Sequence, residues 1–376
     1  MKLIYIANAR IPTEKAHGFQ ISKTCEKFAE KGNFVELWFP NRKNIIKESV
    51  FDYYDIKNNF LCDKIDSIDF IFLDKYLGFL AFYIQSLFFA IKVFLKKISS
   101  DVLIYTRDFL IAVLLNWKGK NVVYNAHNWS FKRGLFLKLF LNKKTKIVCN
   151  SEGTKQGFIK KGFINVISVP NGVDLEKFEK ITESKKDLRE ELNLPADKKI
   201  VLYLGHLYKW KGFDIVVESA KKENNKEILF VAVGGTEKDI ERYSKIIKDN
   251  SIHNLYLVGH KKQEETPYYL KSADVLLLPN IAISEESEKF TSPIKMFEYM
   301  ASGNPIVASD LLSIREILNK GNSILFEQGN VDALLESINK ILADENYAKK
   351  ISSQSKEDVK NYTWDKYADK ILEFIC

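Results

Sequence analysis

Residues 291–309 read TSPIKMFEYMASGNPIVAS, and this stretch decides the fold. Ser292 is a residue type that caps helix N-termini, and Pro293 suits the first helical position, where no backbone donor is needed. Gly303 stands where a helix commonly ends in a left-handed residue. The apolar run at 306–308 predicts a buried strand. The stretch therefore predicts a loop, a helix, a tight turn and a strand.

Lys295 and Glu298 are three residues apart, so the predicted helix presents them on a common face. A helix N-terminus has free backbone N–H groups and the positive end of the helix dipole, which together favour a bound anion. A lysine in the first turn and a carboxylate one turn later can hold a phosphate and then a sugar hydroxyl. The alternative interpretation is a surface helix with an ordinary Lys–Glu pair.

Length and composition set the class of protein. A chain of 376 residues with 46% hydrophobic residues can form two packed domains or one large one. The four cysteines are widely spaced without a C-x-x-C pair, which disfavours a zinc or disulfide scaffold and suits a reducing compartment. The formal charge is +8, but lysines occur throughout the chain, so we expect no nucleic-acid partner. The apolar run at 3–7 predicts a first core strand rather than a signal peptide, and we expect a cytoplasmic protein.

Two series of strands alternate with helices. The first series contains predicted strands at 2–7, 34–39, 101–106, 121–126, 146–150 and 165–169, with a helix at 19–31. After a charge-dense segment at 178–198, the second series has strands at 199–205, 228–233, 255–259 and 273–279. This alternation predicts an α/β protein with two doubly wound, Rossmann-like domains of parallel strands that face a cleft. We place the domains at 1–180 and 181–359, with a C-terminal helix at 360–376 crossing back to the first.

The segment 76–97 is the most apolar part of the chain. It has no charged residue from Tyr76 to Ile91 and then contains Lys92, Lys96 and Lys97. The uncharged run is shorter than the roughly 20 residues that span a bilayer. We favour a long buried helix that covers the sheet. The second interpretation is a peripheral contact with an anionic membrane, in which the lysines meet the headgroups.

Further candidate residues follow strands. His127 lies directly after a predicted strand, and open α/β sheets bind ligands beyond the carboxyl ends of their strands. Gly18, near the start of a helix, lets backbone approach a ligand closely. Gly205 opens a loop that contains Lys211 and Gly212 before the next helix, and this loop offers a cation and backbone donors to a phosphate. Two lysines and backbone amides can neutralise a diphosphate without a metal ion, which a sugar-nucleotide transferase needs for its leaving group.

These segments resemble a known family along nearly the whole chain. The marks are AHGFQ at 16–20, NAH at 125–127, VPNGVD at 169–174, GHLYKWKG at 205–212, ADV at 273–275, and the 291–309 stretch itself. In this order and spacing they resemble the retaining GT-B glycosyltransferases of family 4, in the bacterial group that includes surface-polysaccharide enzymes. The resemblance implies a nucleotide-sugar donor, a glycan or lipid-linked acceptor, and a protein at the inner face of the cytoplasmic membrane.

The resemblance also implies roles for individual residues. Lys211 would bind the donor diphosphate, and Glu298 would bind the ribose. Backbone amides at Thr291 and Ser292 would contact phosphate or sugar, and His127 would lie beside the donor sugar and the reacting bond. Gly18 would let the first loop approach the diphosphate, as Gly205 does from the second series.

The sequence departs from the family pattern at two positions. His206 stands where the family usually has an arginine, so the diphosphate charge would be shared by Lys209, Lys211 and Lys295. Phe290 stands where the family has the first of two glutamates eight residues apart, the second being Glu298. Substitutes for this missing carboxylate are Glu285, Glu286, Glu288 or a backbone contact, and the donor sugar is left open.

The family's chemistry is retaining transfer by front-face displacement. The acceptor hydroxyl attacks on the side from which the diphosphate leaves, and a phosphate oxygen takes its proton. We therefore expect positioning and electrostatics to do the catalysis, with no metal ion or cofactor. One alternative is a non-hydrolysing sugar-nucleotide epimerase of the same fold, which needs several acid–base side chains around the sugar. Another is a non-catalytic scaffold, which the retention of Lys211, Glu298 and His127 argues against.

Overall fold

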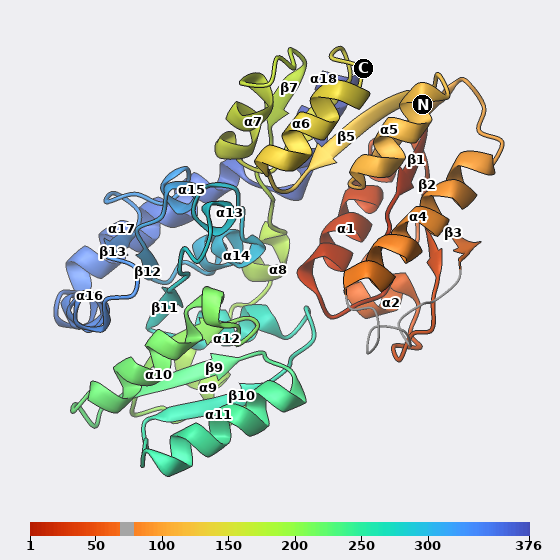
Figure 1. Cartoon of the computed structure of the whole chain (residues 1–376). Helices are drawn as coiled ribbons and strands as arrows, with labels where there is room; N and C mark the ends of the chain where they lie inside the picture. Colours follow the sequence, from red (N-terminus) through yellow and green to blue (C-terminus); the bar gives the residue numbers. More distant parts are fainter. Residues whose placement is uncertain (68–78) are drawn as a thin grey trace. The chain divides into compact units, whose positions relative to one another are not determined.

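The computed structural model describes residues 1–67 and 79–376, and it consists of two compact units (Figure 1). The first unit comprises Met1–Pro170 together with Trp364–Cys376, and the second comprises Asn171–Thr363. Each unit has a parallel sheet between layers of helices. The predicted fold class, two Rossmann-like α/β domains, is confirmed.

The first unit has a seven-stranded sheet in its described residues, with the order β3-β2-β1-β4-β5-β6-β7. Its strands are β1 (Lys2–Ile6), β2 (Phe34–Asn41), β3 (Leu61–Asp66), β4 (Val102–Thr106), β5 (Asn121–Ala126), β6 (Lys146–Cys149) and β7 (Val166–Ser168). Its helices are α1 (Ala16–Glu30), α2 (Val50–Tyr54), α4 (Phe79–Leu95), α5 (Phe109–Trp117), α6 (Phe131–Phe140), α7 (Glu152–Ile159) and α18 (Trp364–Ile375). The central strands are buried on both faces, as parallel strands under two helical layers must be.

The second unit has a six-stranded sheet in the order β10-β9-β8-β11-β12-β13. Its strands are β8 (Lys199–Leu204), β9 (Ile228–Val233), β10 (Leu255–Gly259), β11 (Val275–Leu278), β12 (Ile306–Ser309) and β13 (Ile324–Phe326). Its α-helices are α8 (Leu175–Glu179), α9 (Lys185–Glu191), α10 (Phe213–Lys222), α11 (Glu237–Asp249), α12 (Thr266–Ser272), α13 (Glu285–Lys289), α14 (Ile294–Ser302), α15 (Leu312–Arg315), α16 (Val331–Ala343) and α17 (Glu345–Asp358). Two 3₁₀ turns, η2 (Lys209–Lys211) and η3 (Val359–Asn361), complete it.

The division between the units differs from the boundary predicted at 180. Helix α8 belongs to the second unit, because Val173 and Phe178 are buried in that unit's core. The backbone N–H of Val173 also donates to the carbonyl of Tyr362 at 2.9 Å. The charge-dense segment that suggested the boundary starts only at residue 178, inside α8, whereas the second unit already begins at Asn171.

The C-terminal helix α18 packs on α1 in the first unit, as the sequence predicted. The rings of Phe19 and Trp364 meet edge to face at 6.1 Å. Lys27 pairs with Asp365 at 3.2 Å at the rim of this contact. Apolar contact and a flanking ion pair thus hold the end of the chain on the first unit.

Helix α4 is the described part of the apolar segment 76–97; residues 76–78 lie outside the described residues. Phe89, Ala90 and Val93 are buried in the core of the first unit. Leu95, in contrast, is 69% exposed. The expected buried helix is therefore confirmed for one face of α4, which packs into the core, whereas the other face is exposed. Among the described residues, no helix is both long enough and apolar enough to cross a membrane.

Candidate functional site

Helix α14 and the loop before it form the core of the candidate site. The helix begins with Pro293 as N-cap and has no side-chain cap. Ser292 is therefore not the N-cap that the sequence suggested. Its Oγ accepts a hydrogen bond from the backbone N–H of Asn171 at 3.2 Å, and its carbonyl accepts from Asn171 Nδ2 at 2.6 Å. The helix ends at Gly303 with φ of 76°, as predicted.

Lys295 and Glu298 are buried rather than exposed, with 9% and 8% of their surface accessible. The ammonium of Lys295 lies 4.4 Å from the centre of the Tyr203 ring and has no hydrogen-bond partner among the described residues. Burial, and next the neighbouring charge of Lys211, hold the pKa of Lys295 well below its usual value. The surface-helix interpretation of this pair is excluded, because a solvated surface lysine would be neither buried nor unpartnered.

Glu298 lies one turn further along α14. Its Oε1 accepts a hydrogen bond from Gln263 Nε2. Burial raises the pKa of Glu298 to about 7, despite this bond and the positive charge of Lys177. The carboxyl group of Glu298 is therefore about half ionised near pH 7, and its ionised form can accept a hydrogen bond from a ligand hydroxyl.

The loop before α10 places Lys211 beside Lys295. Lys211 ends the 3₁₀ turn η2, and its Nζ lies 3.9 Å from the centre of the Trp210 ring. Burial lowers the pKa of Lys211 to about 8. Gly212 follows with φ of 78°, and a Cβ there would lie 1.6 Å from the carbonyl oxygen of Pro279. Only glycine can hold this turn, and the turn sets the position of Lys211.

The other residues predicted in this loop have different environments. Gly205 has φ of 133°, and a Cβ there would lie 3.7 Å from Lys295 Nζ. The ring of His206 stacks on that of Tyr208 with centroids 4.9 Å apart, and its carbonyl accepts from Tyr203 Oη at 2.6 Å. Lys209 is exposed. Lys211 and Lys295 are thus the two cations that the fold brings together.

The segment before Ser292 supplies no buried carboxylate in the predicted upstream position. Phe290 is buried there. Thr291 Oγ1 lies 3.1 Å from Ser313 Oγ, which ties this loop to α15. Glu285, one predicted substitute for the missing carboxylate, pairs with Lys289 at 3.2 Å on the exposed face of α13.

His127 lies in the first unit, immediately after β5. Its Nε2 is 2.6 Å from Asn125 Oδ1 and 3.3 Å from Gln20 Nε2. Arg107 donates to Gln20 Oε1 at 2.6 Å, so the glutamine connects the guanidinium to the imidazole. Burial, and then Arg107 and His17, hold the pKa of His127 well below its usual value. The lowered pKa favours the neutral imidazole, which can interact with a ligand through hydrogen bonds.

Gly18 lies within the first turn of α1, also in the first unit. A Cβ at this position would lie 2.0 Å from Tyr54 Oη and 2.6 Å from Thr13 Cγ2. Packing against α2 therefore accounts for this glycine without any ligand.

Sequence reasoning missed the residues that support these groups. They are Tyr203 under Lys295, Gln263 beside Glu298, Asn171 beside Ser292, and Gln20 with Arg107 beside His127. Asn171 and Gln20 fall inside segments that carried the family resemblance, which was the available signal. Tyr203 and Gln263 belong to different elements from their partners, and no local pattern marks them.

The site in the second unit joins two neighbouring ammonium groups, an uncapped helix N-terminus and a carboxyl group. This set can bind a diphosphate and an adjoining sugar hydroxyl. In the part of the chain that the structure describes, no group of three or more His, Cys, Asp or Glu side chains could hold a metal ion.

Two parallel-sheet Rossmann-like domains, with the C-terminal helix on the first, define the GT-B class of fold. Residues 184–358 match the family model of the glycosyl transferases group 1. This similarity covers somewhat less than half of the chain and lies within the second unit. Among curated relatives, an uncharacterized glycosyltransferase of Methanocaldococcus jannaschii is 26% identical over 301 residues, which cover 72% of this chain and 74% of the relative.

A second relative is the Escherichia coli UDP-Gal:alpha-D-GlcNAc-diphosphoundecaprenol alpha-1,3-galactosyltransferase, 26% identical over 59% of this chain and 60% of the relative. Matches to several other relatives cover between 40% and 61% of the relative's own length. Two solved structures share the fold over 99% of both chains. They are Anabaena HepE in complex with UDP, at a TM-score of 0.73 and 16% identity, and the lipopolysaccharide glycosyltransferase WaaG, at 0.70 and 12%.

Proposed function

We propose that this protein is a retaining glycosyltransferase that moves a sugar from a nucleoside-diphosphate sugar to a lipid-linked or polysaccharide acceptor in cell-surface glycan synthesis. The observation that carries the proposal is the buried ammonium of Lys295, which lies beside Lys211 and has no hydrogen-bond partner in the part of the chain that the structure describes. Among the described residues neither Lys211 nor Lys295 forms an ion pair with a carboxylate, so the site favours a multiply charged anion, and a diphosphate is such an anion.

The donor is held by the second unit. Lys211, Lys295 and the amides at the start of α14 neutralise the diphosphate, and Glu298 accepts a hydrogen bond from the ribose. As the glycosidic bond breaks, negative charge grows on the leaving phosphate, and the two ammonium groups stabilise it most at that moment. The acceptor proton passes to a phosphate oxygen, so no metal ion or dedicated base is needed.

His127 contributes from the first unit. Its neutral imidazole, held by Asn125, donates or accepts a hydrogen bond with the donor sugar and does not carry charge. The remaining members of the proposed donor-binding set contribute by shape and backbone contact. They are Gly18, Gly205, His206, Lys209, Phe290, Thr291 and Ser292.

The acceptor class is supported by two relatives. The Escherichia coli galactosyltransferase named above acts on a diphosphoundecaprenol-linked sugar, and another relative is the putative teichuronic acid biosynthesis glycosyltransferase TuaC of Bacillus subtilis. A lipid-linked acceptor places the protein at the inner face of the cytoplasmic membrane, in contact with it through the segment 76–97. The named relatives include glycosyltransferases, which favours transfer over the epimerase alternative.

The test is a panel of UDP-, GDP- and ADP-sugars, screened by thermal shift and then incubated with and without lipid-linked acceptors. Transfer should give a product whose anomeric proton keeps the donor's configuration by NMR, and EDTA should leave the rate unchanged. A new sugar nucleotide in the absence of acceptor would instead establish epimerisation. An inverted product would refute the retaining mechanism, and a loss of rate in EDTA would refute metal independence.

A further inference from the structure

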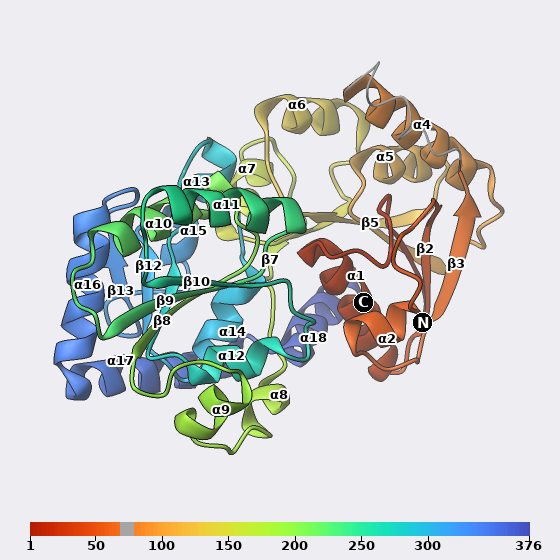
Figure 2. The same cartoon turned by 90° about the horizontal axis from the view of Figure 1, so that it is seen from below.

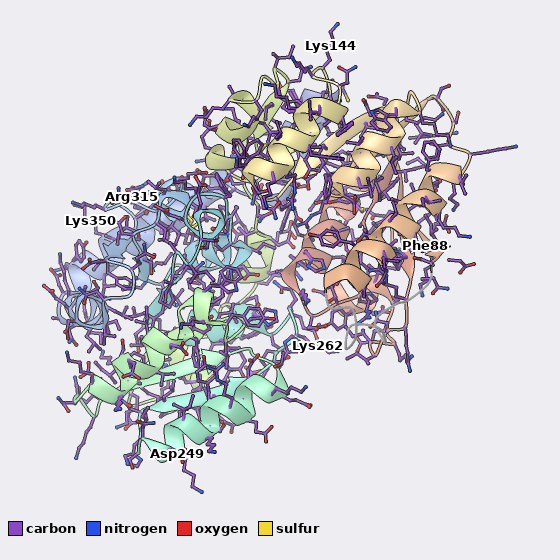
Figure 3. All side chains as sticks on the ribbon, viewed as in Figure 1. Phe88, Lys144, Asp249, Lys262, Arg315 and Lys350 are labelled. Atoms are coloured by element: carbon purple, nitrogen blue, oxygen red, sulfur yellow. The ribbon has the colours of Figure 1, made fainter. Side chains whose placement is uncertain are left out.

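Helix α4 exposes an apolar stripe from Tyr83 to Leu95. Tyr83, Leu87, Ile91 and Leu95 are all exposed and follow one another at four-residue spacing, so they line one side of the helix. Phe88 broadens this stripe (Figure 3). The opposite side of α4 packs into the core of the first unit. The exposed stripe therefore does not contribute to the hydrophobic core of the first unit.

Helix α6 repeats the pattern. Phe131, Leu135 and Leu139 are exposed at the same four-residue spacing, and Phe131 and Leu139 are 69% and 68% exposed. Leu137 and Gly134 are the buried residues of α6, and Leu137 belongs to the first unit's core. Single exposed apolar residues are common on proteins, but two matched stripes on one unit are not.

The two stripes lie on the same side of the first sheet. The chain passes from β3 to β4, from β4 to β5 and from β5 to β6 by crossovers that all step in one direction, and right-handed crossovers put α4, α5 and α6 on one face. Figure 2 shows these three helices side by side over the sheet. At the end of α5, Trp117 is exposed and its ring lies 5.7 Å from that of Phe140. Trp117 thereby extends the α6 stripe toward α5.

Positive charge is concentrated on the same segment. Residues 79–146 contain 12 Lys and Arg and 2 acidic residues, a net charge of +10, whereas the whole chain carries +8. One of the two acidic residues, Asp108, caps the N-terminus of α5 and is no surface charge. Exposed lysines lie on α4 and α6 or close to the ends of α4, α5 and α6 in the sequence: Lys92, Lys97, Lys118, Lys132, Lys138, Lys143 and Lys144. The rest of the chain is slightly acidic.

We propose that the exposed faces of α4 and α6, with Trp117, form one docking surface for an anionic lipid bilayer. Apolar side chains inserted below the headgroups and lysines at the headgroup level are the two interactions that hold an interfacial helix. A second copy of the chain is a poorer occupant, since two such faces would bring like charges together. The inference deepens the membrane contact proposed for 76–97 by adding α6, and it does not depend on sugar transfer.

The experiment is flotation of the full-length protein with phosphatidylglycerol-containing vesicles, with pure phosphatidylcholine vesicles as the neutral arm. We expect binding to the anionic vesicles that weakens with added salt. Leu135→Ser/Leu139→Ser on α6 and Leu87→Ser/Leu95→Ser on α4 should each lower the vesicle-bound to free ratio about tenfold, and Lys132→Gln/Lys138→Gln should lower it on anionic vesicles. These positions are exposed, so the variants should fold, as checked by circular dichroism.

Matched controls lie outside this surface. Ile45→Ser and Ile283→Ser change exposed apolar residues, and Lys349→Gln/Lys350→Gln changes exposed lysines, and none should alter flotation. Undiminished binding by the α6 variants would overturn the two-helix surface and leave α4 alone. Failure of the parent protein to float at low salt would overturn any lipid contact. Loss of a dimer in the variants by sedimentation would assign the surface to a second copy. No donor is present in these assays, so their outcome is separate from the transferase test.

Discussion

The ammonium of Lys295 lies 4.4 Å from the centre of the Tyr203 ring, buried and without a hydrogen-bond partner in the described residues. A buried cation without a carboxylate is unfavourable, and the nearby ring repays only part of the lost hydration. Lys211 makes the position less favourable still. The free protein therefore carries a local cost that a bound diphosphate would remove.

Replacing Lys295 by Met should separate stability from binding. Loss of the buried charge should leave the melting temperature of the free protein unchanged or raise it, because the methionine fills the same space without a charge. Affinity for the nucleoside diphosphate should fall about tenfold or more, since a charged hydrogen bond contributes roughly 1.5–3 kcal/mol. Thermal denaturation and calorimetric titration measure the two effects. Lys289→Met, on exposed α13, is the control and should change neither; a large loss of stability in Lys295→Met would contradict the argument.

The lowered pKa of Lys211 leads us to expect that donor binding depends on pH. Its pKa is about 8 in the free protein, and a bound diphosphate would raise it. Affinity should therefore fall as pH rises above 8, by at most about tenfold per unit for one proton. The unfolded lysine titrates near 10.5, so between pH 8 and that value the unfolded chain binds more protons and the fold gains stability with pH. Lys211→Met should flatten both profiles; equal slopes in the variant and the parent would exclude this lysine.

Glu298→Gln should stabilise the free protein and weaken the donor complex. With a pKa of about 7 against 4.5, the folded state binds more protons than the unfolded chain between these values, so stability falls as pH rises through this window. Glutamine has no such penalty and can still accept from Gln263. We expect a higher melting temperature than the parent at pH 8, little difference at pH 4.5, and a donor affinity about tenfold lower. A variant that is less stable at pH 8 would show that the carboxylate holds the fold.

Gly212→Ala should be far more damaging than an ordinary glycine substitution. The new Cβ would overlap the carbonyl oxygen of Pro279. Gly329 is the matched control, because its φ is also near 80° but nothing lies within 4 Å of its Cβ position. We expect about 1 kcal/mol of destabilisation for Gly329→Ala and roughly 4 kcal/mol or more for Gly212→Ala, by chemical denaturation. Similar losses in both would mean that the loop moves freely.

His127→Ala should lower turnover at least tenfold and leave affinity for the free nucleoside diphosphate unchanged. The histidine lies in the first unit, whereas Lys211, Lys295 and Glu298 lie in the second. Because the pKa of His127 is held well below 6.5, the turnover of the parent should show no imidazole titration between pH 6 and 8. Steady-state kinetics and calorimetry test this. A parallel loss of diphosphate affinity would place the histidine in a different role.

The sequence by itself determined the parallel α/β architecture, the end of α14 at Gly303 and the glycine of the Lys211 turn. Each of these features depends on residues close together in the sequence, because strand and helix periodicity and turn conformation follow from local backbone geometry. The sequence also placed Lys295 and Glu298 on one helix and His127 at the end of a strand.

Only the tertiary structure decided which of these groups are buried and what they contact. Lys295 loses its water because Tyr203, from β8, packs beneath it, and Glu298 meets Gln263 from a loop 35 residues away. The side chain of Ser292 does not cap α14, and it accepts a hydrogen bond from Asn171, 121 residues away, instead. The exposed stripes of α4 and α6 likewise follow from which face the sheet covers. Burial and charge coupling arise between elements distant in sequence, so no local pattern encodes them.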